Sequence, residues 1–329
     1  MRRREFMALL GGAVAWPSPA RAQQSERMRR VGVLANNVET DPVLQSQIAV
    51  FRQALQQLGW IEGRNVQVDV RFTGNAYDRV PQVAEDLVAR GPDVIFAHTT
   101  LAVKALQAKT RTIPIVFVFV SDPVGAGVVA SLARPGGNTT GLLLYEESIV
   151  GKWLGMLKEI SPHLTRAALV ANPKGFTYDH FTRSSKAIAP ALGIELVPAP
   201  VENDAADIEQ RIAAFASAPD GGLFVPPDNT TVQHRDLIIS LAARHRVPAV
   251  YSFRDFTARG GLMSYGTDTL EQARQAASYV DRILRGVDPA NLPVQAPTRY
   301  ETVLNLKTAK ALGFAVPPTL LVRADEVIE

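Results

Sequence analysis

The sequence predicts an α/β protein of two Rossmann-like, doubly wound lobes joined by three crossover segments. Short apolar, β-branched runs alternate with segments of helical periodicity, and this alternation begins again after residue 142. Between the two series lies SDPVGAGVVASLARPGGNTTG (121–141), whose glycines and prolines mark the passage from one lobe to the next. At 329 residues, the chain is long enough for two domains of ordinary size.

The first lobe is predicted from strands that alternate with helices. An apolar face at three- and four-residue spacing runs from Ile48 to Leu58 and predicts a helix that Gly59 ends. The other expected elements are strands 30–36, 66–72, 93–98 and 113–120 and helices 80–88 and 101–108. Because a helix between two strands of one sheet requires parallel pairing, this series predicts one parallel sheet.

The second lobe repeats this architecture but not the sequence. Its expected elements are strands 167–171, 194–199, 222–225 and 248–251 and helices 151–160, 181–192, 204–216 and 233–245. Segments 260–266 and 297–305 are expected to cross between the lobes, with helix 270–284 between them and a short helix, 306–312, after them. The N-terminal lobe is thus assigned to 27–142 plus about 268–297. The C-terminal lobe is assigned to 143–265 plus about 300–329, with a ligand cleft between the two.

Residues 1–22 have the pattern of a signal peptide, with a basic head, an apolar run and a small-residue end at Ala20-Arg21-Ala22. Arg3-Arg4-Glu5-Phe6-Met7 resembles the twin-arginine export motif, and export by the general route is the alternative. The apolar run is too short to span a bilayer. We therefore expect a soluble protein that is exported to the periplasm.

Composition excludes several classes of partner and site. The formal net charge is +3, but removing residues 1–22 takes four of 35 basic and one of 32 acidic residues and leaves 31 of each. A chain with no net charge and no Lys/Arg run lacks the pattern of a nucleic-acid-binding protein. Without cysteine there are no disulfides, thiolate sites or thioether-linked lipid anchors. The five histidines show no metal-ligand spacing, so we expect no metal site. We also expect no cofactor and a monomer.

Four stretches carry a family resemblance: residues 121–142, 152–173, 241–266 and 305–329. Together they resemble the ABC-transporter substrate-binding proteins related to the tryptophan-binding TrpX proteins, a branch of the type I periplasmic binding proteins. The resemblance implies two lobes that close over one ligand, and delivery of that ligand to a membrane permease powered by a separate ATPase. It further implies an amino-acid ligand, often an aromatic one.

Candidate ligand-binding residues follow from the carboxyl ends of the predicted strands, where such sheets bind ligands. The strand-end positions are Asn36, Asn37, His98, Thr99, Thr100, Ser121, Asp122, Asn172, Asp228, Asn229 and Tyr251, and all of them except His98 and Asn229 are candidate ligand contacts. Thr99 and Thr100 begin a helix whose free N–H groups suit a carboxylate, or they only cap it. Asp228 is placed to pair with a ligand ammonium, or it caps the next helix. Asp122 and Asn172 each precede a proline, so turn formation is the alternative role for both.

Aromatic side chains near the predicted crossings offer faces on which a planar ligand could stack. These are Tyr145, Tyr251 and Tyr265, with packing at the hinge as the alternative for each. Hydroxyls, amides and one or two acids together favour a small zwitterion such as an amino acid. A purine, another heteroaromatic compound and a short acyl acid stay as alternatives.

Enzyme signatures are weak in this sequence. Gly125-Ala126-Gly127-Val128-Val129-Ala130 fits G-x-G-x-x-A, but it follows the fourth predicted strand and not the first, which disfavours dinucleotide binding. No G-x-S-x-G nucleophile elbow is present. We therefore expect the binding protein of an importer and no enzymatic activity. A sensor that presents its ligand to a membrane kinase or chemoreceptor is the alternative, and an enzyme on the same fold is disfavoured.

Overall fold

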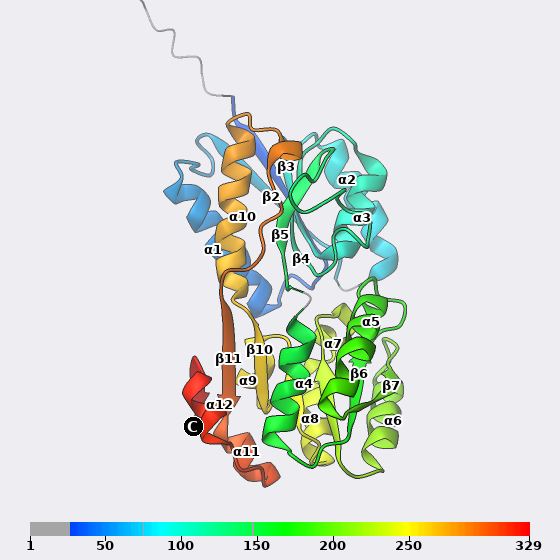
Figure 1. The fold of residues 1–329 in the computed structure, drawn as a ribbon. Coiled ribbons are helices and arrows are strands. Elements are labelled where there is room, and N and C mark those ends of the chain that lie inside the picture. Colours follow the sequence, from blue (N-terminus) through cyan, green and yellow to red (C-terminus); the bar gives the residue numbers. More distant parts are fainter. Residues whose placement is uncertain (1–26, 75, 147) are drawn as a thin grey trace, which may run out of the picture.

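The computed structural model describes residues 27–74, 76–146 and 148–329, which form two lobes stacked end to end (Figure 1). Each lobe has a central sheet with helices on both faces. The predicted signal peptide, 1–22, lies outside the described residues. Within them, no helix is both long enough and apolar enough to cross a membrane.

The N-terminal lobe is built on a parallel sheet with the strand order β2-β1-β3-β4-β5. Its strands are β1 (Arg29–Ala35), β2 (Val66–Phe72), β3 (Val94–His98), β4 (Ile115–Val120) and β5 (Thr139–Leu143). One face is covered by α1 (Pro42–Gln57) and α10 (Thr269–Leu284), and the other by α2 (Val80–Ala89) and α3 (Thr99–Lys109). Short 3-10 segments are η1 (Tyr77–Arg79) and η3 (Pro289–Asn291). Because both faces are covered, the central strands are nearly continuous apolar runs.

The C-terminal lobe is built on a sheet with the order β12-β11-β10-β9-β8-β6-β7, in which β10 and β11 pair antiparallel. Its strands are β6 (Arg166–Ala171), β7 (Glu195–Pro200), β8 (Gly221–Val225), β9 (Ala249–Tyr251), β10 (Met263–Thr267), β11 (Tyr300–Asn305) and β12 (Glu326–Ile328). Its helices are α4 (Ile149–Ile160), α5 (Tyr178–Ile188), η2 (Ala189–Leu192), α6 (Ala205–Ala216), α7 (Asn229–Gln233), α8 (Arg235–Arg244), α9 (Arg254–Ala258), α11 (Leu306–Leu312) and α12 (Pro318–Arg323). Helices α4 and α5 cover one face of this sheet, and α6 and α8 cover the other.

The chain passes between the sheets at three places: after β5, after β10 and before β11 (Figure 1). Helix α10 returns to the N-terminal lobe, where it packs against α1, and Gln295 then bridges to Leu142 beside β5 before the last passage. The predicted fold class, two Rossmann-like lobes joined by three crossovers, is confirmed.

The position of the second crossing differs from the prediction. Segment 260–266 mostly lies inside the C-terminal sheet, where Met263 begins β10, and the crossing comes only after Thr267. Gly266 is placed for close packing, because a Cβ there would collide with the carbonyl oxygen of Ser252. The glycine signal therefore marks a tight contact between neighbouring strands.

The helix predicted over 233–245 is α8, and the short helix α7, which was not predicted, precedes it. Helix α7 ends at Gln233, and α8 starts at Arg235, because His234 leaves helical geometry (φ −101°, ψ 22°). Helices α9 and α12 and strand β12 were not predicted, since segments of three to six residues are too short to show a period. The break at His234 matters for the site, because it sets the start of α8 and hence the position of Arg235.

Candidate functional site

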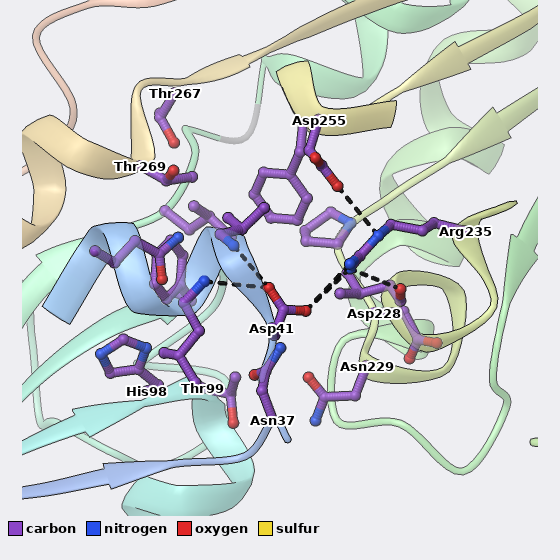
Figure 2. Close-up of a pocket in the computed structure, with 18 of the residues that line it drawn as sticks. Asn37, Asp41, His98, Thr99, Asp228, Asn229, Arg235, Asp255, Thr267 and Thr269 are labelled. Carbon is purple, nitrogen blue, oxygen red and sulfur yellow. Dashed lines mark hydrogen bonds and ion pairs between the residues drawn. The ribbon is translucent and has the colours of Figure 1, made fainter. Parts of the chain in front are cut away.

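A pocket of about 510 Å³ lies between the lobes, at the carboxyl ends of the parallel strands. Open α/β sheets bind their ligands at this edge. The first residues of α1, α3 and α10 all line the pocket, as Figure 2 shows for Thr99 and Thr269. Asp41 and Asp268 cap α1 and α10, so among these three helices α3 is the one whose start is free to favour a negatively charged group.

Helix α3 starts at Thr99 directly after β3, and no side-chain hydrogen bond from the described residues caps it. Thr99 has a φ of +78°, a left-handed conformation that costs a β-branched residue about 1–3 kcal/mol. Its buried Oγ1 has no hydrogen-bond partner among the described residues, and the buried Thr100 follows it in the pocket wall. This uncapped and strained helix start can bind a carboxylate through its backbone N–H groups and hydroxyls.

Asp228 faces the same pocket from the C-terminal lobe. It follows β8 and caps α7, since its Oδ1 accepts hydrogen bonds from the N–H groups of Thr230 (3.0 Å) and Thr231 (3.2 Å). Burial raises the pKa of Asp228 to about 6, although hydrogen bonds from backbone N–H groups act in the opposite direction. A ligand ammonium group would supply the positive charge that stabilises this carboxylate.

An aromatic wall crosses the pocket between the lobes. Phe119 belongs to β4 and Phe253 follows β9, and their ring centroids lie 6.4 Å apart, edge to face. Phe119 has a φ of +58° and sits where the β4–β5 register shifts. Such a bulge turns a side chain away from the direction that strand alternation would give it. Here it directs the Phe119 ring towards His98 (5.4 Å) and the cleft.

An ion-pair network joins the lobes at the pocket (Figure 2). Asp41 caps α1 with its Oδ1, while its Oδ2 accepts from both terminal nitrogens of Arg235, each at 3.2 Å. The Arg235 Nε lies 3.1 Å from Asp255 Oδ2. The Asp41 and Arg235 side chains are only 8% and 12% exposed, so water screens this pair weakly. A second contact between the lobes joins the Tyr77 hydroxyl to Thr230 Oγ1 at 3.3 Å.

The structure brings four of the predicted site residues into the pocket: Asn37, Thr99, Thr100 and Asp228. The remaining predicted residues do not line it: Asn36, Ser121, Asp122, Tyr145, Asn172, Tyr251 and Tyr265. Asn36 accepts a hydrogen bond from the Thr73 hydroxyl, and Ser121 is buried at the end of β4. Asn172 donates to Thr230 Oγ1 (3.0 Å), behind the wall that Asp228 forms.

Asp122 connects the lobes outside the pocket. Its Oδ1 accepts from the Gly125 N–H at 2.7 Å, which braces the turn after β4. Its Oδ2 lies 3.3 Å from His180 Nδ1 and 3.9 Å from Arg183, both on α5 of the other lobe. The turn-forming alternative for Asp122 therefore has structural support, together with a contact between the lobes that the sequence did not predict.

The three predicted tyrosines pack and do not face the pocket. Tyr145 donates to the Ser252 carbonyl at 2.6 Å, which ties the first crossover to the loop after β9. Tyr251 is buried and stacks on Phe256 with centroids 5.0 Å apart. Tyr265 stacks on Tyr300 at 5.4 Å, across the pair β10–β11. The contacts of Tyr145 and Tyr265 support the alternative of packing near the hinge, whereas Tyr251 packs in the core of the C-terminal lobe.

Several pocket residues were missed by sequence reasoning. They are Asp41, Tyr77, Phe119, Arg235, Phe253, Asp255 and Thr267. A local signal existed for Asp41, because an aspartate directly before a proline is typical of a helix N-cap. His98 and Asn229 are predicted strand-end positions and also line the pocket, although neither is among the candidate ligand contacts. No local pattern connects Arg235 with Asp41, which lies 194 residues earlier in the chain.

Comparison with known proteins agrees with this geometry. The family model described as ABC transporter substrate binding protein matches residues 31–328. A curated relative from Clostridioides difficile, named tyrosine-binding protein, is 26% identical over 288 residues, which are 88% of this chain and 82% of that protein.

Solved structures show the same fold. A conserved domain protein from Vibrio cholerae is 30% identical, with a TM-score of 0.85 over 92% of this chain and 100% of that chain. A Streptococcus pneumoniae ABC domain in complex with L-Trp is 24% identical, with a TM-score of 0.83 over 92% and 100% of the two chains. The family model spans nearly all of the described residues, and the Vibrio cholerae relative matches over its whole length. This chain therefore belongs to the ABC transporter substrate binding protein family.

Proposed function

We propose that this protein is the extracytoplasmic receptor of an ABC importer and that it binds an aromatic amino acid by closure of its two lobes. One observation carries the proposal: the uncapped start of α3 and the buried carboxylate of Asp228 line one pocket from opposite lobes. An α-amino acid holds its carboxylate and its ammonium on one carbon atom. It can therefore bridge the two lobes and stabilise the closed arrangement.

The aromatic part of the proposal rests on the wall formed by Phe119 and Phe253. A flat ligand ring gains dispersion and quadrupole interactions against such rings, beyond the burial of apolar area. The names of the relatives point the same way, since one is a tyrosine-binding protein and another was solved with L-Trp.

A ligand screen tests the binding function. The purified protein is unfolded, washed free of any bound compound, refolded, and then melted with amino acids, nucleobases, sugars or organic acids. A ligand that binds only the folded state raises the melting temperature by mass action. We expect shifts with aromatic amino acids. A shift restricted to sugars or nucleobases would contradict the amino-acid assignment and keep a binding protein.

Closure is tested separately by small-angle X-ray scattering with and without the bound amino acid. A receptor that closes on its ligand becomes more compact, because the ligand makes contacts with both lobes only in the closed state. An unchanged radius of gyration on saturation would contradict closure as the binding mechanism.

Export supports the importer assignment and rests on the pattern of residues 1–22. Cell fractionation with N-terminal sequencing of the recovered protein tests it. We expect periplasmic protein that begins at Gln23, and a cytoplasmic protein that retains residues 1–22 would contradict export.

A further inference from the structure

His98 presents an unused polar group at the wall of the pocket. It ends β3, lines the cavity, and is only 2% exposed (Figure 2). Its ring packs edge-on to Phe96 at 4.6 Å and tilted against Phe119 at 5.4 Å. Its buried Nε2 has no hydrogen-bond partner among the described residues. A buried polar atom without a partner is unusual in a native protein and calls for an explanation.

The imidazole is neutral at physiological pH, because burial lowers the pKa of His98 to about 3. One ring nitrogen therefore carries a hydrogen and donates, and the other accepts. A neutral imidazole is a poor site for a ligand carboxylate. It can accept a hydrogen bond from a ring N–H, and it can donate to or accept from a hydroxyl.

The surroundings of His98 match an aromatic ring with a polar edge. The Phe119 ring, turned by the bulge in β4, lies beside the imidazole and continues to Phe253 of the other lobe. A flat ligand ring that packs on this wall brings its edge to the imidazole. The buried Oγ1 of Thr267, which also lines the pocket and lacks a partner among the described residues, adds a second polar atom.

We propose that His98 is a specificity residue that selects aromatic amino acids whose ring bears an O–H or N–H group, as in tyrosine or tryptophan, over phenylalanine. The inference rests on the amino-acid function proposed above. Phenylalanine would pack against the same aromatic wall but leave the His98 nitrogen and the nearby hydroxyls without a hydrogen-bond partner. Sites built to hydrogen-bond a substrate group discriminate strongly against the analogue that lacks it.

Calorimetric titration of the ligand-stripped protein with tyrosine, tryptophan and phenylalanine tests this selection. We expect tyrosine or tryptophan to bind about 10- to 100-fold more tightly than phenylalanine. In His98→Phe, which keeps an aromatic ring, that preference should fall below about threefold, and affinity for phenylalanine should hold or rise. His98→Gln keeps a hydrogen-bonding side chain and should retain part of the preference.

His163→Phe is the matched control, since His163 is exposed and lies outside the pocket; its ligand preference should equal that of the wild type. Equal wild-type affinity for all three amino acids would overturn the selection by His98 and leave the amino-acid function intact. An equal loss for all three in a folded His98→Phe would overturn it too, because His98 would then contact the part that the ligands share. Failure of the wild type to bind any amino acid would contradict the proposed function itself, and the inference with it.

Discussion

Replacing Asp228 by asparagine should stabilise the ligand-free protein and weaken its binding of an amino acid. Asparagine keeps the oxygen that accepts from the N–H groups of Thr230 and Thr231, so the cap of α7 remains. The substitution removes the buried negative charge, which in the absence of ligand is the unfavourable part of the site. Stability and binding are therefore expected to change in opposite directions.

The size of the stability gain follows from the pKa. Burial raises the pKa of Asp228 from 3.8 to about 6, so between these values the folded protein holds a proton that the unfolded chain has released. Stability from this group is therefore lost as the pH rises through that window. The raised pKa of Asp228 costs the fold about 3 kcal/mol above pH 7, roughly half of that at pH 5, and little at pH 4.

Urea unfolding of the ligand-stripped wild type and Asp228→Asn at pH 8 and pH 5 measures this difference. We expect the variant to be more stable by about 3 kcal/mol at pH 8 and by roughly half of that at pH 5. Asp204→Asn is the matched control, because Asp204 caps α6 from an exposed position and reports the effect of the cap exchange alone.

Two results would refute this reasoning. A variant no more stable than the wild type at pH 8 would mean that the Asp228 carboxylate is not unfavourably buried. A gain that stays the same at both pH values would assign the effect to the cap and not to the charge. In the binding arm, loss of the ammonium partner should weaken amino-acid affinity by about 10- to 150-fold, and unchanged affinity would remove Asp228 from the ligand site.

Three further predictions concern the same pocket. Because the ligand ammonium needs the ionised form of Asp228, amino-acid affinity should be constant from pH 7 to pH 8 and fall about tenfold per pH unit below about pH 6. Titration calorimetry across this range measures the affinity, and an affinity that does not change with pH would contradict the prediction. Arg235→Gln removes the cation that ties Asp41 of the N-terminal lobe to the C-terminal lobe, while Asp255 keeps its pair with Arg259. The variant should open the lobes, lowering ligand affinity by about tenfold or more and raising the ligand-free radius of gyration, whereas unchanged scattering would show that the pair does not hold the lobes together. Thr99→Gly relieves the left-handed strain and should raise ligand-free stability by up to ~1 kcal/mol while weakening binding, and a less stable variant in denaturant unfolding would argue against strain at this position.

The fold was largely predictable because its signals are local. Alternation of apolar strands with amphipathic helices specifies a parallel sheet with helices on both faces, and the restart after residue 142 specifies a second lobe. The second crossing was misplaced because a glycine can mark either a flexible hinge or a close contact between backbone segments. Gly266 allows close approach of the Ser252 carbonyl, and nothing in the sequence distinguishes this role from that of a hinge.

The site was predictable only where a strand end alone decides the position of a side chain. Asn37, Thr99 and Asp228 follow their strands and lie at the cleft. Tyr251 also ends a strand, but its ring turns into the core against Phe256. The strand-end rule identifies the edge of the sheet, and the direction of each side chain depends on contacts with residues far away in the chain.

Phe119 shows why the aromatic wall escaped prediction. Strict alternation along β4 would place it on the same face as Phe117, which packs in the core beneath α2 and α3. The register shift after Phe117 and the positive φ of Phe119 turn its ring to the opposite side, where it meets His98. A bulge of this kind depends on how β4 pairs with β5, so the local sequence does not predict it.

Several strained or unsatisfied groups of the described residues lie at the pocket. Thr99 and Phe119 are two of the four described non-glycine residues with positive φ, and both line the cavity. The unpaired buried atoms of His98 and Thr267 lie in the same wall. Each of these features is unfavourable in the empty protein, and a ligand that pairs the polar atoms and the Asp228 charge removes much of the cost. Under the proposed receptor function, the closed form would therefore depend on the ligand for part of its stability, and occupancy would be signalled through the shape of the protein.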